Sequence, residues 1–362
     1  MNKFKLGTNF DFALLDAIKK ENDTNELGNT VQEVYGSIRA HASLAARPDF
    51  RLPVVSNDKF IEYVRYAKER GINFNYTLNS IQPMENKLNF EKHAQEIIDL
   101  IEWFAEIGVY RITIANPMLL ELVKRAKHHP LVEISTIAHI DTITQIRYFF
   151  ETYGVTKICA NVNKNRNFNW LEKAAKYCND NNIELELMAN EFCGVGGKGY
   201  ATHCIYRDSC YICHSTNKDE ADAKALDSYP MKQCTMSRNS DPANWLKVKF
   251  IRPEDLKAYN DIGIYNFKLT GRTASTEYLV KVLHAYMTEN WEGNLLGLWK
   301  PLESITHEKD ESFTSYNIPN KALDNFINMW SKSYHDCDNE VCGQTCQYCQ
   351  RWYEEHVKEL QK

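Results

Sequence analysis

Short apolar segments rich in β-branched residues recur along the chain and alternate with longer segments whose apolar residues repeat at helical spacing. The short segments predict strands at Phe4–Asn9, Val31–Tyr35, Ile72–Leu78, Tyr110–Ala115, Val132–Ala138, Thr156–Val162, Ile183–Met188 and Ile264–Leu269. The longer segments predict amphipathic helices, including Asn57–Arg70, Phe90–Ile107, Asp141–Tyr153 and Asn167–Asn181. Alternation of this kind indicates parallel strands joined by right-handed crossovers.

The number of strand–helix units favours an α/β protein with a TIM-like (β/α)8 barrel. An open dinucleotide-binding sheet is disfavoured, because no G-x-G-x-x-G turn follows the first predicted strand. We predict that residues 1–290 form the barrel and that a cysteine-rich insertion at 194–245 follows the seventh strand. This insertion greatly exceeds the usual loop of about two to six residues, which favours a functional role. Residues 291–362 are predicted to form a helical, cysteine-rich C-terminal appendage.

Composition limits the classes of function. The chain of 362 residues, 43% hydrophobic and 25% charged, is large enough for one barrel of ~250 residues with additions. Its net charge of -5 gives no support to a nucleic-acid partner, although a local basic patch would still allow one. No apolar stretch approaches the ~18 residues of a membrane helix, and the first ten residues contain no apolar signal core. We therefore expect a cytoplasmic protein with no membrane partner, of an oligomeric state that the sequence does not indicate.

The 11 cysteines fall mainly into two groups. Clustered thiols in a reducing compartment bind metal more often than they form disulfides. The first group, in and beside the insertion, contains Cys193, Cys204, Cys210, Cys213 and Cys234. It has a single C-x2-C pair, whereas a zinc ribbon would show two, so its spacing favours an iron–sulfur cluster. Buried thiols without a metal are the alternative interpretation.

The second cysteine group lies near the C-terminus, with the spacing C-x4-C-x3-C-x2-C. Its members are Cys337, Cys342, Cys346 and Cys349. Four thiolates are the usual ligand set both for zinc and for an iron–sulfur cluster. The sequence therefore predicts a four-cysteine site that holds either zinc or a second cluster.

Active-site residues of (β/α)8 barrels lie at the C-terminal ends of the strands. By this rule the catalytic candidates are Glu191, His139 and Arg272. The substrate-binding candidates are Glu33, Tyr35, Tyr76, Asn116, Asn161 and Lys268. Asparagine also commonly caps the helix that follows a strand, so capping is the alternative role for the two asparagines.

Several motifs resemble the collagenase-like peptidase family U32, specifically its cysteine-rich bacterial branch, over nearly the whole chain. They are ELMANEFC (186–193), HCIYR (203–207), the Cys234 segment, FIRPEDLKAYNDIGIYNFKLTGR (250–272) and CGQTCQYCQ (342–350). The resemblance implies a barrel-like fold and, as in some family members, a 4Fe-4S cluster held by four cysteines. Those members support oxygen-independent hydroxylation of ubiquinone precursors or of RNA bases, despite the family's name.

The resemblance also implies roles for individual residues. It places cluster ligands at Cys193, Cys204 and Cys234, with Cys210 as the fourth ligand and Cys213 as its alternative. Three basic residues match further motif positions and are interpreted as binding an anionic substrate group or supporting the cluster. These are Arg207, Lys268 and Arg272; ion pairs with Glu191 or Asp255 are the structural alternative.

Three functions follow from these patterns. The first is an iron–sulfur enzyme that takes electrons from a donor protein or small reductant and modifies an aromatic, nucleobase or peptide substrate. The second is a peptidase, although neither H-E-x-x-H nor a serine elbow is present, and only Cys213 with His214 or His203 offers a nucleophile pair. The third is an electron-transfer or maturation accessory without a substrate of its own.

Overall fold

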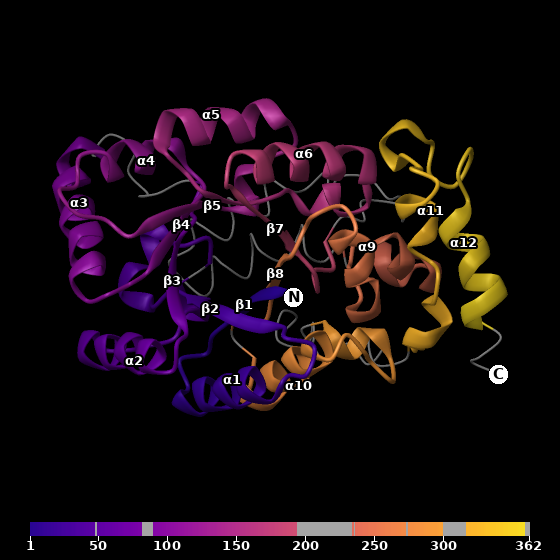
Figure 1. Cartoon of the computed structure of the whole chain (residues 1–362), viewed down its shortest axis with the longest axis horizontal. Helices are drawn as coiled ribbons and strands as arrows, with labels where there is room; N and C mark the ends of the chain where they lie inside the picture. The colour runs from indigo at the N-terminus through magenta and orange to yellow at the C-terminus, as the bar shows by residue number, and fades with distance from the viewer. Residues whose placement is uncertain are drawn as a thin grey trace.

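Eight parallel strands close into a barrel in the order in which they occur along the chain (Figure 1). The computed structural model describes residues 1–47, 49–81, 90–193, 234, 236–272, 274–299 and 316–358. The strands are β1 (Lys3–Gly7), β2 (Thr30–Gly36), β3 (Asn73–Leu78), β4 (Arg111–Ile114), β5 (Leu131–Ile134), β6 (Lys157–Cys159), β7 (Glu184–Met188) and β8 (Asn266–Leu269). The prediction of a TIM-like (β/α)8 barrel is confirmed.

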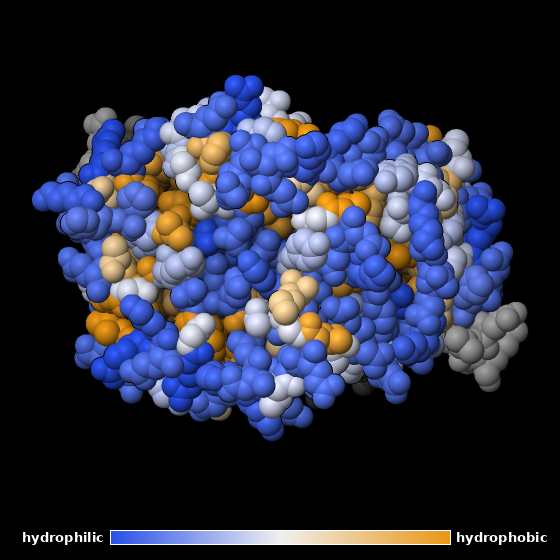
Figure 2. Space-filling view, in the orientation of Figure 1, coloured by the Kyte–Doolittle hydropathy of each residue, from blue (hydrophilic) through white to orange (hydrophobic). Residues whose placement is uncertain are grey.

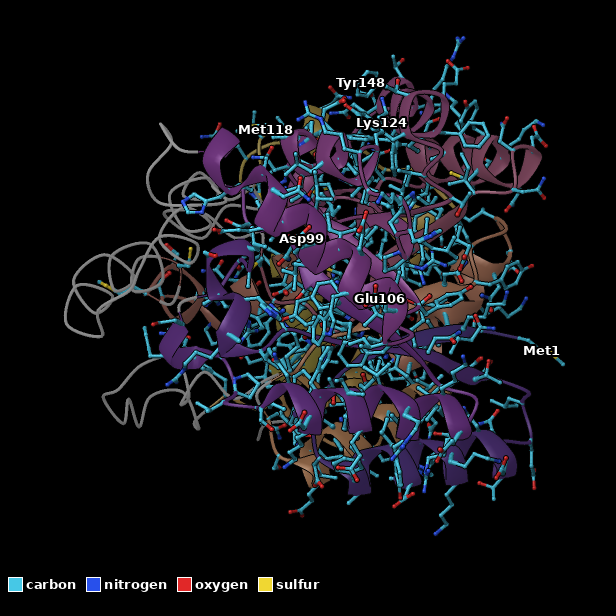
Figure 3. The ribbon with its side chains drawn as sticks, turned by 90° about the vertical axis from the view of Figure 1, so that its left-hand side faces the viewer. Met1, Asp99, Glu106, Met118, Lys124 and Tyr148 are labelled. Atoms are coloured by element: carbon cyan, nitrogen blue, oxygen red, sulfur yellow. The ribbon has the colours of Figure 1, made fainter. Side chains whose placement is uncertain are left out.

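Helices follow the strands and cover the outside of the barrel. They are α1 (Phe12–Thr24), α2 (Asn57–Glu69), α3 (Phe90–Glu106), α4 (Pro117–Val123), α5 (Ile143–Tyr153), α6 (Phe168–Asp180), α9 (Leu256–Asn260) and α10 (Thr276–Met287). Their ends follow local sequence rules: Thr142 and Gln145 form a capping box at the start of α5, and Gly154 ends that helix with a φ of 64°. In Figure 3, Asp99 and Glu106 of α3 and Lys124 of α4 lie on the outer surface.

Shorter 3-10 turns position the loops at the C-terminal end of the barrel. Those used below are η1 (Arg39–Leu44), η4 (Thr136–Ala138), η5 (Val162–Arg166) and η7 (Pro242–Lys247). The appendage contains η12 (Asn320–Leu323), α11 (Asn328–Ser331), η13 (Cys337–Asn339), α12 (Tyr348–Trp352) and the π-helical turn η14 (Tyr353–Val357). Between η12 and α11, Asn325 adopts a φ of 71°.

The appendage packs against the βα loops of the barrel, next to α9 in Figure 1. Phe250 of the loop before β8 stacks on Phe326, and Phe326 stacks on Tyr348 at 5.3 Å between ring centroids. Arg252 donates to the carbonyl of Asn320 at 2.7 Å and also pairs with Asp255. These buried contacts fix the cysteine-rich end of the chain against the barrel.

The surface shown in Figure 2 is mostly hydrophilic, with hydrophobic residues scattered in small groups. None of the helices in the described part of the chain is long and apolar enough to span a membrane.

Charged side chains fill the interior of the barrel, where branched apolar residues are usual. They are Lys5, Glu33, Arg111, Glu133, Lys157 and Glu186, all buried. Lys5 and Arg111 each contact two carboxylates, and Lys157 contacts three, of which Glu184 is the most distant at 3.8 Å. Lys157 Nζ lies 3.1 Å from Glu33 and 3.2 Å from Glu186, Lys5 binds Glu133 and Glu186, and Arg111 binds Glu33 and Glu184. We call these residues, together with Glu184, the interior ion network.

The interior ion network favours the ionised forms of Glu33 and Glu186. Burial alone would raise the pKa of Glu33, but Lys157 and Arg111 outweigh burial and lower that pKa to about 2. Burial likewise opposes the charge of Lys157, yet Glu186 and Glu33 raise its pKa. Removing a single charge from the network would therefore leave its buried partners uncompensated.

Candidate functional site

Three cations gather at the C-terminal end of the barrel around the ring of Tyr35. Lys268 of β8 lies 4.2 Å from the ring centroid, and the guanidinium carbon of Arg272, just beyond β8, lies 5.7 Å from it. Arg47, in the loop after η1, is close enough to Tyr35 and Arg272 to affect their charges. We call Arg47, Lys268, Arg272 and Tyr35 the cationic mouth.

Arg272 reaches this position because β1 ends in a glycine. Gly7 pairs with Tyr35 across the sheet, and a Cβ atom at Gly7 would come within 2.8 Å of the Arg272 nitrogen. The backbone after β8 therefore crosses closely over the end of β1. The Arg272 guanidinium then donates to Thr77 Oγ1 at 2.8 Å and to Ser37 Oγ at 3.4 Å. Residues in or just beyond β1, β2, β3 and β8 thus fix the Arg272 side chain over the end of the barrel.

The charges of the cationic mouth are poorly compensated. Burial and the neighbouring Arg272 lower the pKa of Arg47 to about 9, and burial also lowers the pKa of Arg272. Lys268, 4% exposed, has its pKa lowered by burial and by Lys5. Among the described residues, no carboxylate forms an ion pair with any of these three cations. Cations that lie close together without ion-paired carboxylates favour the binding of an anion.

The catalytic candidates lie at the predicted strand ends. Glu191 follows β7, and its Oε1 atom accepts from the backbone amides of Phe192 and Cys193 at 2.8 and 3.2 Å. His139 follows η4 after β5 and has a left-handed φ of 54°. Glu191 is close enough to Arg47 to influence it. Neither Glu191 nor Asp255 pairs with Lys268 or Arg272 among the residues described, so the ion-pair alternative is not what this structure shows.

Three substrate-binding candidates have structural partners instead. Glu33 is 3% exposed and belongs to the interior ion network, below the mouth. Asn116 accepts from Met118 N as the N-cap of α4, and Asn161 accepts from Asn163 N as the N-cap of η5. We therefore leave these three out of the site. Arg207, Cys204, Cys210 and Cys213 lie outside the described residues.

Tyr76 belongs to a buried aromatic group beside the mouth. Its hydroxyl accepts from Ile38 N at 3.0 Å and contacts His41 Nδ1 at 2.7 Å. The His41 ring also packs edge-on against Phe104. Burial lowers the pKa of His41 to about 4, so the imidazole is neutral near pH 7. Tyr76 therefore supports the loop after β2, which carries Arg47.

His41 is expected to make stability depend on pH. Its folded pKa of about 4 lies below the ~6.5 of an unfolded histidine, so the unfolded chain alone takes up a proton as the pH falls between these values. The free energy of unfolding should therefore fall by on the order of 2 kcal/mol from pH 7 to pH 5. Urea unfolding should show this loss in the native chain and its absence in His41→Gln. His128→Gln, at an exposed position, should keep the loss, and an unchanged pH dependence in His41→Gln would contradict the assignment.

Two cysteines of the first group lie on neighbouring segments. Cys193 is exposed beyond β7, and Cys234 is half-buried. The guanidinium of Arg238, one helical turn after Cys234, lies 5.2 Å from the ring of Phe192, the residue before Cys193. Since Glu191 also contacts the Cys193 amide, these cysteines border the mouth.

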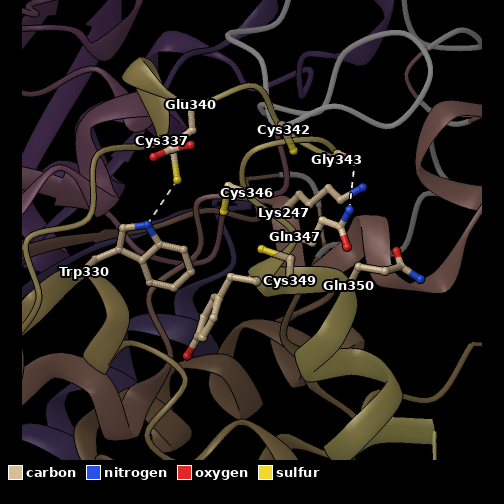
Figure 4. A pocket seen from close by; sticks show the side chains of 11 residues that line it. Lys247, Trp330, Cys337, Glu340, Cys342, Gly343, Cys346, Gln347, Cys349 and Gln350 are labelled. Carbon is tan, nitrogen blue, oxygen red and sulfur yellow. Dashed lines mark hydrogen bonds between the residues drawn. The ribbon is translucent and has the colours of Figure 1, made fainter.

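The four C-terminal cysteines line a single cavity of about 270 Å³, together with Lys247, Trp330 and Glu340 (Figure 4). Trp330 Nε1 donates to Cys337 Sγ at 3.1 Å. Burial raises the pKa of Cys349 to about 12, although Arg166 favours its thiolate. Within the described ranges, no three histidine, cysteine or acidic side chains are grouped closely enough to hold one metal ion. The second cysteine group is thus gathered in space around an opening wider than one ion.

Sequence reasoning missed Arg47 and His41. Both lie in the loop after β2, several residues beyond the strand end where site residues were sought. Arg47 enters the mouth because η1 folds back, with Ala46 N donating to Asn79 Oδ1 at 3.1 Å. The single signal in the sequence was a basic residue in a long loop at the C-terminal end of a strand.

Fold and site together define a (β/α)8-barrel protein with a cation-lined mouth at the C-terminal end of the barrel. Residues 27–290 match the profile of peptidase family U32, and the chain belongs to this family. It is 27% identical over 303 residues to an uncharacterized protease of Methanocaldococcus jannaschii, covering 82% of this chain and 80% of the relative.

Solved structures also resemble the chain. A U32 peptidase matches with a TM-score of 0.43 at 14% identity, over 75% of this chain and 93% of that one. A GH113 β-1,4-mannanase matches with a TM-score of 0.39 at 10% identity, over 87% and 98% of the two chains. Similarity at this level concerns the barrel and not its chemistry.

Proposed function

We propose that this U32 family member is an iron–sulfur enzyme that carries out oxygen-independent hydroxylation, or a related redox modification, of an anionic substrate. The substrate class is an aromatic compound, a nucleobase or a peptide bearing a negatively charged group. The observation that carries the proposal is the cationic mouth. Lys268 is buried and Arg47 and Arg272 are half-buried; none of the three forms an ion pair with a carboxylate among the described residues, and Glu191, two residues before Cys193, is close enough to influence Arg47.

The barrel cluster would be held by Cys193 and Cys234, with two further ligands among Cys204, Cys210 and Cys213. The exposed thiol of Cys193 and the half-buried Cys234 suit ligands at the edge of a site that a redox partner must reach. A bound 4Fe-4S cluster would supply one-electron transfer, with electrons exchanged with a donor protein or small reductant. The hydroxyl oxygen would come from an oxygen donor other than molecular oxygen, which is reduced as the substrate is oxidised.

The chain's own residues bind and orient the substrate. Arg272 is held by Thr77 and Ser37 through one nitrogen, which leaves its other N–H groups for an anionic group. The ring of Tyr35, held under Lys268 and Arg272, forms the floor of the mouth. Glu191, just beyond β7, and His139, after β5, are placed to move protons, and two backbone amides hold the Glu191 carboxyl group in position.

A peptidase is the second candidate, because the archaeal relative is described as a protease. In that case the cationic mouth would bind the carboxyl end or an acidic side chain of a peptide. An electron-transfer accessory, the third interpretation of the sequence, does not account for cations gathered around a tyrosine ring.

Metal content and activity of anaerobically purified protein test the proposal. The double variant Cys193→Ala/Cys234→Ala should contain about four fewer irons than the native chain and should fail to add oxygen to nucleobase or quinone-precursor substrates. Cys178→Ala, a buried site on α6, is the matched control and should retain both properties. Full iron content in the double variant would contradict the proposal. Peptide cleavage by that variant would establish the peptidase instead.

A further inference from the structure

The C-terminal cysteines are brought together by a compact turn. Gly343 adopts a φ of 86° and donates its N–H to the carbonyl of Cys346 at 2.8 Å. The backbones of Cys342 and Cys346 form an isolated β-bridge. Cys349 follows in the first turn of α12. Cys337, from η13, approaches from the side of Trp330, so the sulfur atoms lie around a common space (Figure 4). The thiols of the cavity therefore come from two separate segments.

The size of this cavity distinguishes between zinc and an iron–sulfur cluster, the two occupants that the cysteine spacing allows. Zinc binds thiolates at ~2.3 Å, so four sulfur atoms must converge on one point. Among the described residues these side chains are not grouped that closely. Instead they border about 270 Å³, several times the ~30 Å³ occupied by one water molecule in the liquid. A space of this size suits a cluster of several atoms.

A buried cation lies behind the wall of the cavity. Arg166 is 3% exposed, and its guanidinium carbon lies 4.5 Å from the ring centroid of Trp330, which lines the cavity. Its Nη1 donates to the carbonyl of Leu246 at 2.7 Å, whereas its Nε has no hydrogen-bond partner in the described part of the structure. Asp255 is close enough for Arg166 to favour its carboxylate, but Asp255 is paired with Arg252, and no described carboxylate forms an ion pair with Arg166. Four thiolates around a 4Fe-4S core carry net negative charge, which would compensate Arg166.

The sulfur atom of Cys337 is already oriented. Trp330 donates its indole N–H to this atom, and Trp330 itself is fixed by edge-to-face contacts with Phe326 and Tyr348. Hydrogen bonds to ligand sulfurs stabilise negative charge on the cluster and tune its reduction potential. A thiol without a metal does not require such a fixed donor.

We propose that Cys337, Cys342, Cys346 and Cys349 bind a second 4Fe-4S cluster, and not zinc. This assignment does not depend on the barrel cluster, because all four ligands lie in the appendage.

The test uses the full chain with the barrel ligands removed. Anaerobically reconstituted Cys193→Ala/Cys234→Ala should hold about four irons and four sulfides and give the spectrum of a reducible 4Fe-4S cluster. Adding Cys337→Ala or Cys349→Ala should remove that iron, whereas adding Cys178→Ala should not. About one zinc without iron, or no metal, in the barrel-ligand variant would overturn the proposal.

Two comparisons keep the outcomes distinct. If Cys193→Ala/Cys234→Ala loses all the iron of the native chain, the barrel cluster stands and the C-terminal cluster is overturned. If that variant keeps all its iron and loses it only when Cys349→Ala is added, the C-terminal cluster stands and the barrel cluster is overturned. Trp330→Phe keeps an aromatic ring but removes the indole N–H donor. It tests the proposal without changing a cysteine, in case a cysteine variant does not fold. The cluster should remain with a lower reduction potential, and an unchanged potential would overturn the assignment of Cys337 as a ligand.

Discussion

Replacing Lys157 with methionine should lower the free energy of unfolding by about 3–5 kcal/mol, the largest change expected for a single substitution in this barrel. Lys157 is buried between Glu33 and Glu186, and burial strongly disfavours a carboxylate that loses its cation. Methionine fills a similar volume, so the loss should come from the charge imbalance and not from a cavity.

Urea unfolding measures this effect, and a second substitution identifies its cause. Lys157→Met/Glu186→Gln removes one charge of each sign and leaves Lys5 with Glu133 and Arg111 with Glu33. The double variant should therefore recover part of the lost stability. Lys173→Met, on the exposed face of α6, should change stability by no more than about 0.5 kcal/mol. A double variant less stable than Lys157→Met would show that packing, and not charge balance, is responsible.

Lys268→Met should have the opposite effect on stability and should impair binding. Burial and Lys5 disfavour the charge of Lys268, so removing that charge should raise the free energy of unfolding by about 1–2 kcal/mol. The same change removes one of the three cations that face the proposed anion. Affinity for an anionic ligand should therefore fall by about tenfold or more. A variant that is more stable but binds worse is typical of a functional site.

Thermal unfolding with and without inorganic phosphate or adenosine monophosphate measures both effects. The native chain should be stabilised by the anion, and Lys268→Met should start from a higher midpoint and gain less. Lys20→Met removes a positive charge at an exposed position on α1, outside the cationic mouth. The anion should stabilise this variant as much as it stabilises the native chain. Equal stabilisation of Lys268→Met and the native chain by both anions would argue against an anion site at the mouth.

The alternation of strands and helices was enough to predict the barrel, because each predicted strand coincides with an observed one. How deep a given side chain lies within the barrel was not predictable from the sequence. Glu33 and Lys268 both occupy inward-facing positions of short strands, yet one lies in the interior ion network and the other at the mouth. This difference depends on the register of neighbouring strands and on their tertiary partners, which periodicity does not report.

The two cysteine groups illustrate a second limit. Spacing alone indicated that Cys337 and Cys349 belong to one site, and the structure places them around the same cavity. The choice between one ion and a cluster required the width of that cavity. Arg47 could not be inferred in this way, since its approach to Arg272 depends on how η1 folds over the end of β2.

The interior ion network also limits how this protein can evolve. Lys5, Glu133, Lys157 and Glu186 come from four different strands, so no local mutation can exchange two of them at once. A lineage that loses one of these charges passes through a poorly folding intermediate unless the codon for an oppositely charged partner on another strand changes as well. Descendants should therefore either retain the whole set or replace opposite charges together. Traces of this coupling should persist in the family's ancestry even where the residues of the mouth have diverged with the substrate.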